Sequence, residues 1–599
     1  MRGPAARNLA LLALAGALVS TGADAPSSKS ATPQKVPVAA GYGGAVASVD
    51  ADASAVGIAV LRNGGNAVDA AVATAAALGV TEPYSAGIGG GGYFVYYDAR
   101  SRRVSTIDGR ETAPATATAG LFQENGKPIP FAEGQTSGRG VGVPGTPATW
   151  HSALETWGTL PLGQLLKPAE RLARRGFTVD STFRAQTELN EARFRDFPDT
   201  RQLFLPGGAL PVVGSTFKNP DLADTYAELG RKGAGTLYRG RLAEDIVRAV
   251  RTPPVDPDAT RVVRSGDLTT GDLRAYATKR QDPTRVGYRG LDVYSMAPSS
   301  SGGTTVGEAL NILERTDLGE LTEAQYLHRF IEASRISFAD RGRWVGDPAA
   351  EDVPTKELLS QAYADTRGCL IDPAKALTSP LAPGDPRHPV ACGGSGQVAP
   401  TTYEGENTTH LTVADRWGNV VSYTLTIEST GGSAITVPGR GFLLNNELTD
   451  FSFAPAAPGV PDPNLPGPGK RPRSSMSPTI VLEDGRAVLA LGSPGGATII
   501  TTVLQTLTGH LDRGLPLVEA IAAPRASQRN QTTTELEPEL WNSPVRAELA
   551  ALGQGFRQNP EIGAATGVQR LPDGRWLAAA ETSRRGGGSA MVVYSYGRP

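Results

Sequence analysis

The chain is poor in the residues that most metal centres use. It contains two cysteines and five histidines among 599 residues, whereas structural zinc sites and iron–sulfur clusters draw several ligands from Cys and His at set spacings. We therefore expect no metal and no cofactor. Uninterrupted apolar runs are also short, and none approaches the about 20 residues that a membrane-spanning helix needs. The sequence predicts no membrane span in the mature protein.

A charge excess of either sign is missing as well. Lys plus Arg number 58 and Asp plus Glu number 60, so the basic surplus that is typical of nucleic-acid binders is absent. Hydrophobic residues make up 40% of the chain, which excludes disorder throughout and allows a large core. Glycine is abundant, at 72 residues, and this number indicates many tight turns or close backbone contacts.

Residues 1–25 have the features of a secretory signal peptide. Arg2 and Arg7 precede the apolar run 9–19, and small residues follow up to Ala25. That run suits a signal sequence and is too short to cross a bilayer. The sequence thus predicts a secreted or periplasmic protein, with an uncleaved N-terminal anchor as the alternative.

The two cysteines, Cys369 and Cys392, lie 23 positions apart. In an exported chain such a pair is most simply a disulfide. Two free thiols are the alternative, which an oxidising compartment disfavours.

Helical patterns alternate with strand patterns that are mostly connected as hairpins. This arrangement favours an α+β fold with antiparallel sheets and helix layers. Residues 26–40 are expected to be disordered, and the Pro- and Gly-rich stretch 453–473 is expected to be a surface loop. The predicted helices include 51–63, 66–78 and 324–338, and the predicted strands include 93–97, 103–107, 408–414, 420–427, 479–482, 487–491, 568–571, 576–580 and 590–594.

Three glycines, Gly87, Gly89 and Gly92, match the spacing of a dinucleotide-binding fingerprint. That motif should follow a strand and open a helix. Here it follows a helical stretch and leads into a strand, so we interpret these glycines as positions of close backbone packing.

Two other segments carry chemistry. Thr408 stands at the start of a strand, where threonine is usually only a good strand former. Gly495 and Gly496 directly precede a helix, so their N–H groups could hold an anion.

With these segments in place, the chain resembles the γ-glutamyltranspeptidase family of N-terminal-nucleophile hydrolases through nearly its whole mature length. The resemblance rests on many motifs in the right order. They are Gly64-Gly65-Asn66-Ala67-Val68-Asp69-Ala70-Ala71, Asp108-Gly109-Arg110-Glu111-Thr112-Ala113-Pro114, Pro298-Ser299-Ser300-Ser301-Gly302-Gly303, Thr408-Thr409-His410, Leu444-Asn445-Asn446-Glu447-Leu448-Thr449-Asp450-Phe451, Ser474-Ser475, Ser493-Pro494-Gly495-Gly496 and Arg585-Gly586-Gly587-Gly588.

The resemblance implies a four-layer αββα sandwich with two stacked antiparallel sheets, made as one precursor. The precursor would cut itself between Asn407 and Thr408. The products would be a large subunit of residues 26–407 and a small subunit of residues 408–599, which stay together as a heterodimer.

The resemblance also implies roles for single residues. The free α-amine of Thr408 would activate its own hydroxyl as the nucleophile. Thr426 would assist it, and the N–H groups of Gly495 and Gly496 would hold the oxyanion. For the γ-glutamyl donor, Arg110, Ser474 and Ser475 match positions that hold the α-carboxylate. Glu447 and Asp450 match positions that hold the α-ammonium, and an ordinary buried polar network is the alternative for both acids.

Two features depart from the family pattern. Glu428 stands where typical glutathione-cleaving members carry Asn, and a carboxylate there would attract an α-ammonium and repel an α-carboxylate. The loop 452–473 looks shorter than in members with a lid and lacks the lid's Tyr. Both features suggest an open site and leave the physiological donor undecided.

The sequence therefore predicts a secreted, self-processing γ-glutamyltransferase and glutathione hydrolase. It would transfer the γ-glutamyl group of a small donor to water or to an amino acid or peptide acceptor. A poly-γ-glutamate or cephalosporin-side-chain amidase is the alternative within the same superfamily. An inactive, unprocessed scaffold that serves as an extracellular binding protein is the alternative from another class.

Overall fold

The structure is a computed structural model that describes residues 34–393, 405, 407–455 and 459–594. These residues belong to one unit, Pro33–Pro599. The predicted signal peptide, residues 1–25, lies outside the described residues. Within the described ranges, no helix combines the length and the apolar character needed to cross a bilayer.

Two seven-stranded antiparallel sheets form the centre of the unit. The first sheet has the order β21 (Ser589–Val592), β2 (Gly44–Ser48), β12 (Thr409–Asp415), β13 (Val420–Thr426), β3 (Gly91–Asp98), β4 (Arg103–Gly109) and β9 (Lys279–Gln281). The second sheet has the order β1 (Val38–Gly41), β20 (Trp576–Ala580), β19 (Thr566–Arg570), β15 (Arg486–Gly492), β14 (Thr479–Glu483), β11 (Leu291–Ser295) and β10 (Thr284–Tyr288).

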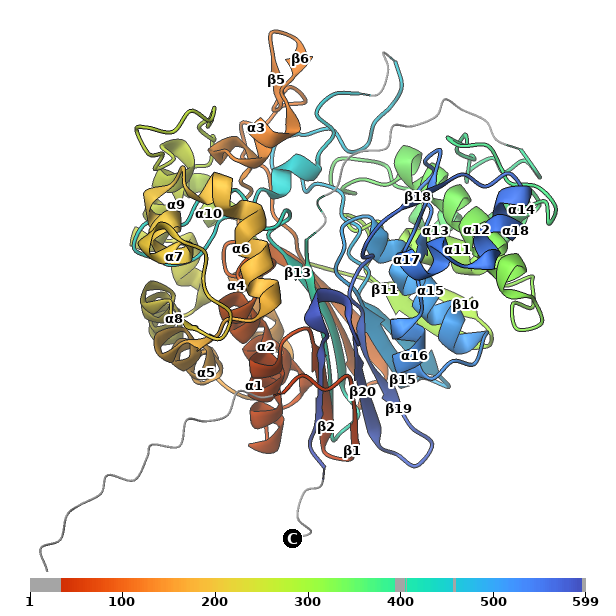
Figure 1. The fold of residues 1–599 in the computed structure, drawn as a ribbon, viewed down its shortest axis with the longest axis horizontal. Coiled ribbons are helices and arrows are strands. Elements are labelled where there is room, and N and C mark those ends of the chain that lie inside the picture. Colours follow the sequence, from red (N-terminus) through yellow and green to blue (C-terminus); the bar gives the residue numbers. More distant parts are fainter. Residues whose placement is uncertain (1–33, 394–404, 406, 456–458, 595–599) are drawn as a thin grey trace, which may run out of the picture. The chain divides into compact units, whose positions relative to one another are not determined.

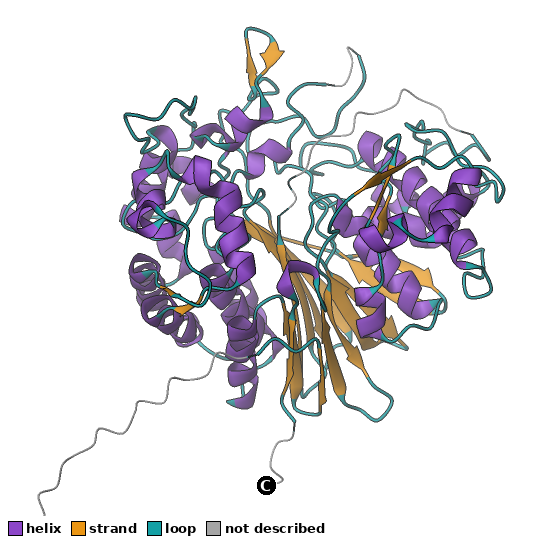
Figure 2. Ribbon diagram, in the orientation of Figure 1, coloured by secondary structure: helices purple, strands orange, loops and turns teal. Residues whose placement is uncertain are grey.

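Helices cover the outer face of each sheet, while the inner faces pack on one another (Figures 1 and 2). The first sheet contacts α1 (Ala51–Arg62), α2 (Ala67–Thr81) and α4 (Thr146–Trp157), and α5 (Leu162–Arg175) and α8 (Pro220–Lys232) lie outside them. The second sheet contacts α11 (Gly302–Leu313), α15 (Thr498–Leu511) and α16 (Leu517–Ala522), and α12 (Glu323–Trp344) packs on α11. The predicted four-layer αββα sandwich is confirmed.

Smaller elements surround the sandwich. The remaining α-helices are α3 (Phe131–Gln135), α6 (Ser181–Phe194), α7 (Pro198–Phe204), α9 (Arg241–Arg251), α10 (Thr270–Ala275), α13 (Thr355–Leu358), α14 (Gln361–Gly368), α17 (Pro538–Trp541) and α18 (Pro544–Ala551). The remaining strands are β5 (Gln123–Glu124), β6 (Lys127–Pro128), β7 (Phe177–Thr178), β8 (Thr216–Phe217), β16 (Ala526–Ser527), β17 (Thr534–Leu536) and β18 (Phe556–Gln558).

Strands from both sides of the Asn407–Thr408 bond interleave in both sheets. In the first sheet, β12 lies between β2 and β13, and in the second sheet β20 lies between β1 and β19. A cut at this bond would therefore leave two chains joined by main-chain hydrogen bonds in each sheet and by one buried core.

Close backbone contacts explain the glycines before β3. A Cβ at Gly89 would collide with the carbonyl oxygen of Leu443, and one at Gly92 would collide with that of Thr424. The prediction of tight packing is confirmed for Gly89 and Gly92, because only glycine leaves room for these neighbours. A Cβ at Gly87 would meet no atom within 4 Å, and this residue has a positive φ of 147° instead.

Two sequence predictions about irregular segments are wrong in part. Residues 38–40, expected to be disordered, belong to β1, which pairs with β20. The second half of the segment 453–473 lacks regular structure as predicted but is buried rather than exposed. Its polar groups are satisfied inside the protein, since Asp347 accepts a hydrogen bond from the N–H of Arg471 at 2.9 Å and Asn464 accepts one from the N–H of Arg473 at 2.8 Å.

Helix α2 is buried along its whole length and depends on one carboxylate at its start. Asp69 accepts hydrogen bonds from the N–H of Asn66 at 3.0 Å, of Thr159 at 2.9 Å and of Leu160 at 3.2 Å. The side-chain oxygen of Asn66 accepts a hydrogen bond from the N–H of Asp69, which completes a capping box. One acid thus fixes both the helix start and the loop that precedes α5.

We predict that Asp69→Ala lowers the free energy of unfolding by about 3 kcal/mol, because it leaves several buried N–H groups without an acceptor. Asp221→Ala is the matched control, since Asp221 is an exposed acid in the first turn of α8. The control should change stability by at most about 0.5 kcal/mol. Thermal unfolding at one scan rate measures both variants, and equal shifts would contradict the role of Asp69.

Candidate active site

The pairing of β12 with β13 places two threonines across from one another. Thr409 opposes Leu425, so Thr408, directly before β12, faces Thr426 at the end of β13. The hydroxyl of Thr426 donates a hydrogen bond to the carbonyl oxygen of Asn407 at 3.0 Å and accepts one from the N–H of Glu428 at 2.8 Å. The carbonyl of the Asn407–Thr408 bond is therefore polarised by a fixed hydroxyl donor.

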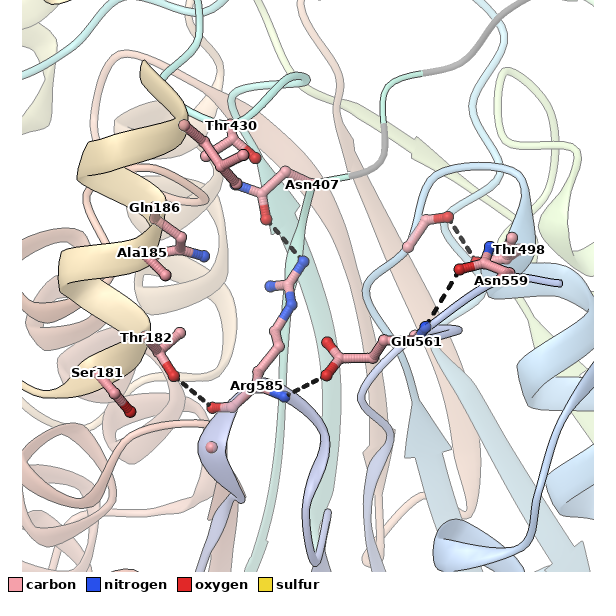
Figure 3. Close-up of a pocket in the computed structure, with 14 residues that line it drawn as sticks. Ser181, Thr182, Ala185, Gln186, Asn407, Thr430, Thr498, Asn559, Glu561 and Arg585 are labelled. Atoms are coloured by element: carbon pink, nitrogen blue, oxygen red, sulfur yellow. Dashed lines mark hydrogen bonds between the residues drawn. The ribbon is translucent and has the colours of Figure 1, made fainter. Parts of the chain in front are cut away.

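Arg585 is hydrogen-bonded to the residues on both sides of this peptide bond. Its guanidinium donates a hydrogen bond to the carbonyl oxygen of Thr408 at 2.7 Å. It donates another to Oδ1 of Asn407, also at 2.7 Å (Figure 3). Ser85 also donates to Oδ1 of Asn407 at 2.9 Å, and the Asn407 amide donates to the carbonyl of Tyr84 at 2.8 Å. The side chain of Asn407 is thus fully engaged.

Sequence reasoning assigned no role to Arg585 or Ser85. The only available signal for Arg585 was its place in the late Arg-Gly-Gly-Gly motif. Ser85 belongs to no motif that the sequence analysis singled out.

The glycine loop lies between β15 and α15. Gly495 and Gly496 have positive φ angles of 130° and 55°, which favour glycine. Their carbonyls accept hydrogen bonds from the N–H groups of Thr498 and Ile499 at 3.1 and 3.0 Å. Within the described ranges, their own N–H groups have no partner. Two free N–H groups beside the positive end of a helix form a favourable place for a developing oxyanion.

A narrow cavity of about 20 Å³ brings the predicted site residues together. It is lined by Arg110, Gly405, Asn407, Thr408, Thr426, Glu428, Glu447, Asp450, Ser474, Ser475, Met476, Gly496 and Ile499. Of the predicted catalytic and substrate-binding residues, only Gly495 lies outside this lining, and it lines the neighbouring cavity instead. The space suffices for about one water molecule, so the uncut chain leaves no room here for a substrate.

Arg110 is buried and paired with two acids. Its guanidinium donates to Glu447 and to Asp450, and it also bonds the carbonyl of Arg473 at 3.0 Å. Burial raises the pKa of Glu447 well above its usual range and raises the pKa of the adjacent Glu111 to about 8. Near neutral pH this acidic pair therefore retains a proton. A cation beside acids can bind both ends of an amino-acid head group, which carries one charge of each sign.

Ser474 and Ser475 are held by the loop before α11 and by α12. The hydroxyl of Ser301 donates to the carbonyl of Ser474 at 2.6 Å, and Arg341 donates to the hydroxyl of Ser475 at 2.9 Å. Arg341 also bonds the hydroxyl of Ser301 at 2.7 Å. One buried guanidinium thus fixes both segments, and sequence reasoning did not identify it.

Glu428 adopts a strained backbone with φ of 77°, which is uncommon for a residue with a side chain. One carboxylate oxygen accepts hydrogen bonds from Ser429 and Asn446, while the other has no hydrogen-bond partner among the described residues. Burial raises the pKa of Glu428 to about 7. Gly405 lies against this carboxylate, since a Cβ there would collide with it.

His410 is not available as a base. Its Nδ1 lies 2.8 Å from the hydroxyl of Thr424, and burial lowers the pKa of the ring to about 3. Gly492 packs directly against the ring, where no Cβ would fit. The imidazole is a neutral part of the core between the sheets.

The two cysteines lie outside this cavity. Cys369 and Cys392 form a disulfide with a Cα–Cα distance of 5.3 Å, after α14. Among the described residues, no group of three or more His, Cys, Asp or Glu side chains is arranged to hold a metal ion.

The chain is similar in sequence to known proteins of one family. The profile of the family described as Gamma-glutamyltranspeptidase matches residues 53–592. The chain is 38% identical to a glutathione hydrolase proenzyme of Bacillus subtilis strain 168, over 91% of each chain. It is 37% identical to a glutathione hydrolase proenzyme of Escherichia coli K12, over 90% of each chain.

A solved structure shares the fold across nearly the whole chain. The cephalosporin acylase of Bacillus halodurans superposes with a TM-score of 0.81 at 26% identity. The alignment covers 95% of this chain and 99% of the acylase. The chain is thus similar both to glutathione hydrolase proenzymes and to an acylase.

The depressed pKa of His410 predicts a pH-dependent stability. An unfolded histidine titrates near pH 6.5, whereas the folded ring stays neutral down to about pH 3. Between these values the unfolded state binds a proton that the folded state lacks, so stability rises with pH. We predict that the loss of unfolding free energy from pH 7 to pH 4.5 is about 3 kcal/mol smaller in His410→Gln than in the wild type.

Urea unfolding at the two pH values measures this difference. His151→Gln is the matched control, because His151 is exposed on α4, and it should behave like the wild type. A His410→Gln variant with the wild-type pH dependence would contradict the neutral, buried ring.

Proposed function

The chain belongs to the gamma-glutamyltranspeptidase family, and from this premise we propose that it is a secreted, self-processing γ-glutamyltransferase and glutathione hydrolase. The proposal rests mainly on the groups that surround the Asn407–Thr408 bond. Thr426 polarises its carbonyl, and Arg585 is hydrogen-bonded to the residues on both sides of it. The narrow cavity, which Gly496 also lines, lies beside it.

The first reaction is the cut of the precursor. The hydroxyl oxygen of Thr408 attacks the carbonyl carbon of Asn407, and the C–N bond breaks as the Thr408 nitrogen takes up a proton. Water then hydrolyses the resulting ester. The products are the Asn407 carboxylate, the free hydroxyl of Thr408 and its free α-amine. Residues 26–407 and 408–599 become the two subunits of a heterodimer, held together by the interleaved sheets.

The second reaction uses the newly exposed threonine. A terminal α-amine has a pKa of about 7.7–8.0 and accepts the hydroxyl proton near neutral pH. The oxygen of Thr408 attacks the γ-carbonyl of the donor, and the N–H groups of Gly495 and Gly496 hold the oxyanion. The amine leaves with the proton and an acyl-ester remains. Water or an acceptor amine then releases the γ-glutamyl group and restores the hydroxyl.

The charged cavity suits the α-amino acid end of the donor. Arg110, Ser474 and Ser475 would hold the α-carboxylate, while Glu447, Asp450 and Glu428 would hold the α-ammonium. In the uncut chain Arg110 is paired with two of these acids, Glu447 and Asp450. A donor would insert its carboxylate and ammonium between them, so each charge exchanges one partner for another. This exchange limits the cost of desolvating the site.

An amidase of another acyl group remains the second candidate. Glu428 stands in place of the family's usual Asn, and the fold matches a cephalosporin acylase over nearly its full length. Assays of glutathione, poly-γ-glutamate and a glutaryl-cephalosporin side by side would rank the two functions. The inactive-scaffold alternative requires a chain that folds and never cuts itself.

We predict that purified wild-type protein separates into two chains that join at Asn407–Thr408. Thr408→Ala should stay a single chain and lose all γ-glutamyl hydrolysis, because it lacks the attacking oxygen. Thr408→Ser is the matched control, since it keeps a hydroxyl and should still be cut. Denaturing gels and intact-mass measurement check the cut, and release of p-nitroaniline from γ-glutamyl-p-nitroanilide checks the activity.

Either of two results would overturn this proposal. An active Thr408→Ala variant would show that Thr408 is not the nucleophile. A stable, uncut wild-type chain would favour the alternative of an inactive scaffold that serves as an extracellular binding protein.

The raised pKa of Glu428 predicts a pH effect specific to donors with an α-ammonium. Because its pKa is about 7, the carboxylate gains its charge, and its attraction for the ammonium, as pH rises from 6 to 8. The ratio of kcat/KM for γ-glutamyl-p-nitroanilide to that for glutaryl-p-nitroanilide should rise about threefold to tenfold over this range. The glutaryl donor lacks only the α-amine, so titration of the Thr408 amine cancels in the ratio.

Glu428→Gln should make this ratio independent of pH, as the glutamine is isosteric and uncharged. If the variant keeps the wild-type rise, Glu428 does not bind the ammonium.

A further inference from the structure

A second, larger cavity adjoins the candidate active site on the far side of Asn407. It has a volume of about 490 Å³, within the range typical of small-molecule sites. One wall is α6, and the opposite wall consists of Thr498, Asn559 and Glu561 (Figure 3). Asn407 lines both this cavity and the narrow one around Thr408. The two spaces therefore meet at the bond that is cut, and the side chain of Asn407 separates them.

We propose that this cavity binds the amine-bearing partner of the reaction, and that Arg585 binds the α-carboxylate of that partner once Asn407 has been released. The inference rests on the proposed function. It assigns one guanidinium to two successive tasks, first on the precursor and then on an amino-acid acceptor.

Charge supports the assignment. Among the residues that line the cavity, Arg585 is the only cation and Glu561 the only anion. The guanidinium of Arg585 donates only to the neutral oxygens of Thr408 and Asn407 within the described ranges. Burial lowers the pKa of Arg585 while the negative charges of Glu82 and Glu561 act to raise it, but neither carboxylate is hydrogen-bonded to the guanidinium. A half-buried cation with neutral partners favours an incoming carboxylate.

Two hydrogen bonds fix the backbone of Arg585 and so direct its side chain toward Asn407. Its carbonyl accepts a hydrogen bond from Thr182 on α6 at 3.0 Å, and its N–H donates to Glu561 at 3.0 Å. The residue thus bridges both walls of the cavity, and the guanidinium extends from this bridge to Asn407 (Figure 3). If Asn407 moves away after the cut, the guanidinium loses one acceptor, while the backbone hydrogen bonds to Thr182 and Glu561 stay in place.

Covalent geometry shows what can replace Oδ1 of Asn407. The path from the scissile carbonyl carbon of Asn407 to Oδ1 runs through Cα, Cβ and Cγ. In a γ-glutamyl amide, the path from the acyl carbon to a carboxylate oxygen of the amino acid runs through the nitrogen, Cα and the carboxyl carbon. Both paths contain the same number of bonds. A carboxylate next to the reacting amine can therefore reach the position that Oδ1 occupies beside Arg585.

The transfer step then balances without further reagents. The amine nitrogen of the acceptor attacks the acyl carbon, and the ester bond to the Thr408 oxygen breaks. The proton lost by the amine passes through the α-amine of Thr408 to that oxygen. Arg585 takes no part in the proton transfer; it orients the amine by its carboxylate and so determines which acceptors react.

Wild-type enzyme, with γ-glutamyl-p-nitroanilide as donor, tests the inference through pairs of acceptors. Each pair is an L-amino acid and its carboxamide, compared at equal concentrations of unprotonated amine. The carboxylate form should react with a kcat/KM about tenfold or more above that of the carboxamide, the size of a charge-assisted hydrogen bond. Arg585→Gln should abolish this preference. Arg184→Gln is the matched control, because Arg184 on α6 bonds the carbonyl of Pro211, and it should keep the preference.

Ala185→Trp provides a second test in case Arg585→Gln does not cut itself. It narrows the cavity from α6 and leaves the hydrogen bonds of Arg585 intact, so the ratio of transfer to hydrolysis should fall. An unchanged ratio, a wild type without carboxylate preference, or an Arg585→Gln variant that keeps it would overturn the inference. Normal donor hydrolysis in those cases would leave the proposed function standing, whereas a wild type that hydrolyses no γ-glutamyl donor would remove the function itself.

Discussion

The pairing of β12 with β13 in the centre of the first sheet is the interaction on which the site depends. Both strands are buried on both faces, with helices on one side and the second sheet on the other. Their register cannot slip by one residue without moving every side chain to the opposite face. This constraint fixes Thr408 opposite Thr426. The glycine loop after β15 then approaches from the second sheet, so each sheet supplies one side of the reacting centre.

Burial gives the charged residues of the site their properties. Arg110, Glu447 and Asp450 lie almost entirely out of water, where an unpaired charge is costly and a paired one is held in a fixed position. The same burial raises the pKa values of Glu111, Glu428 and Glu447. The cavity consequently carries less negative charge at neutral pH than its acids alone would suggest, and the positive end of a donor is balanced by groups that can release a proton.

The sequence was sufficient for the fold class and for most of the residues that line the narrow cavity, because these lie in local motifs. It could not identify Arg585, Ser85 or Arg341 as contacts of the site, since each reaches it from a distant segment through the packing of layers. The buried half of the segment 453–473 was mistaken for a surface loop for a related reason. Its Pro and Gly content predicts irregular backbone. Only the structure shows that its polar groups are satisfied by Asp347, from a distant part of the chain, and by Asn464, within the segment itself.

In the proposed mechanism, Asn407 would connect masking of the Thr408 nucleophile with closure of the site. While the peptide bond is intact, the nitrogen of Thr408 is an amide and cannot serve as a base. At the same time, the side chain of Asn407 stands between the two cavities, and Gly405 lies against Glu428. The intact Asn407–Thr408 bond would therefore keep three things from forming. They are the α-amine of Thr408 that acts as the base, the space for the donor in the narrow cavity, and the passage to the second cavity. Under the proposed mechanism, cutting this bond would supply all three at once, so an uncut chain would be inactive by geometry as well as by chemistry.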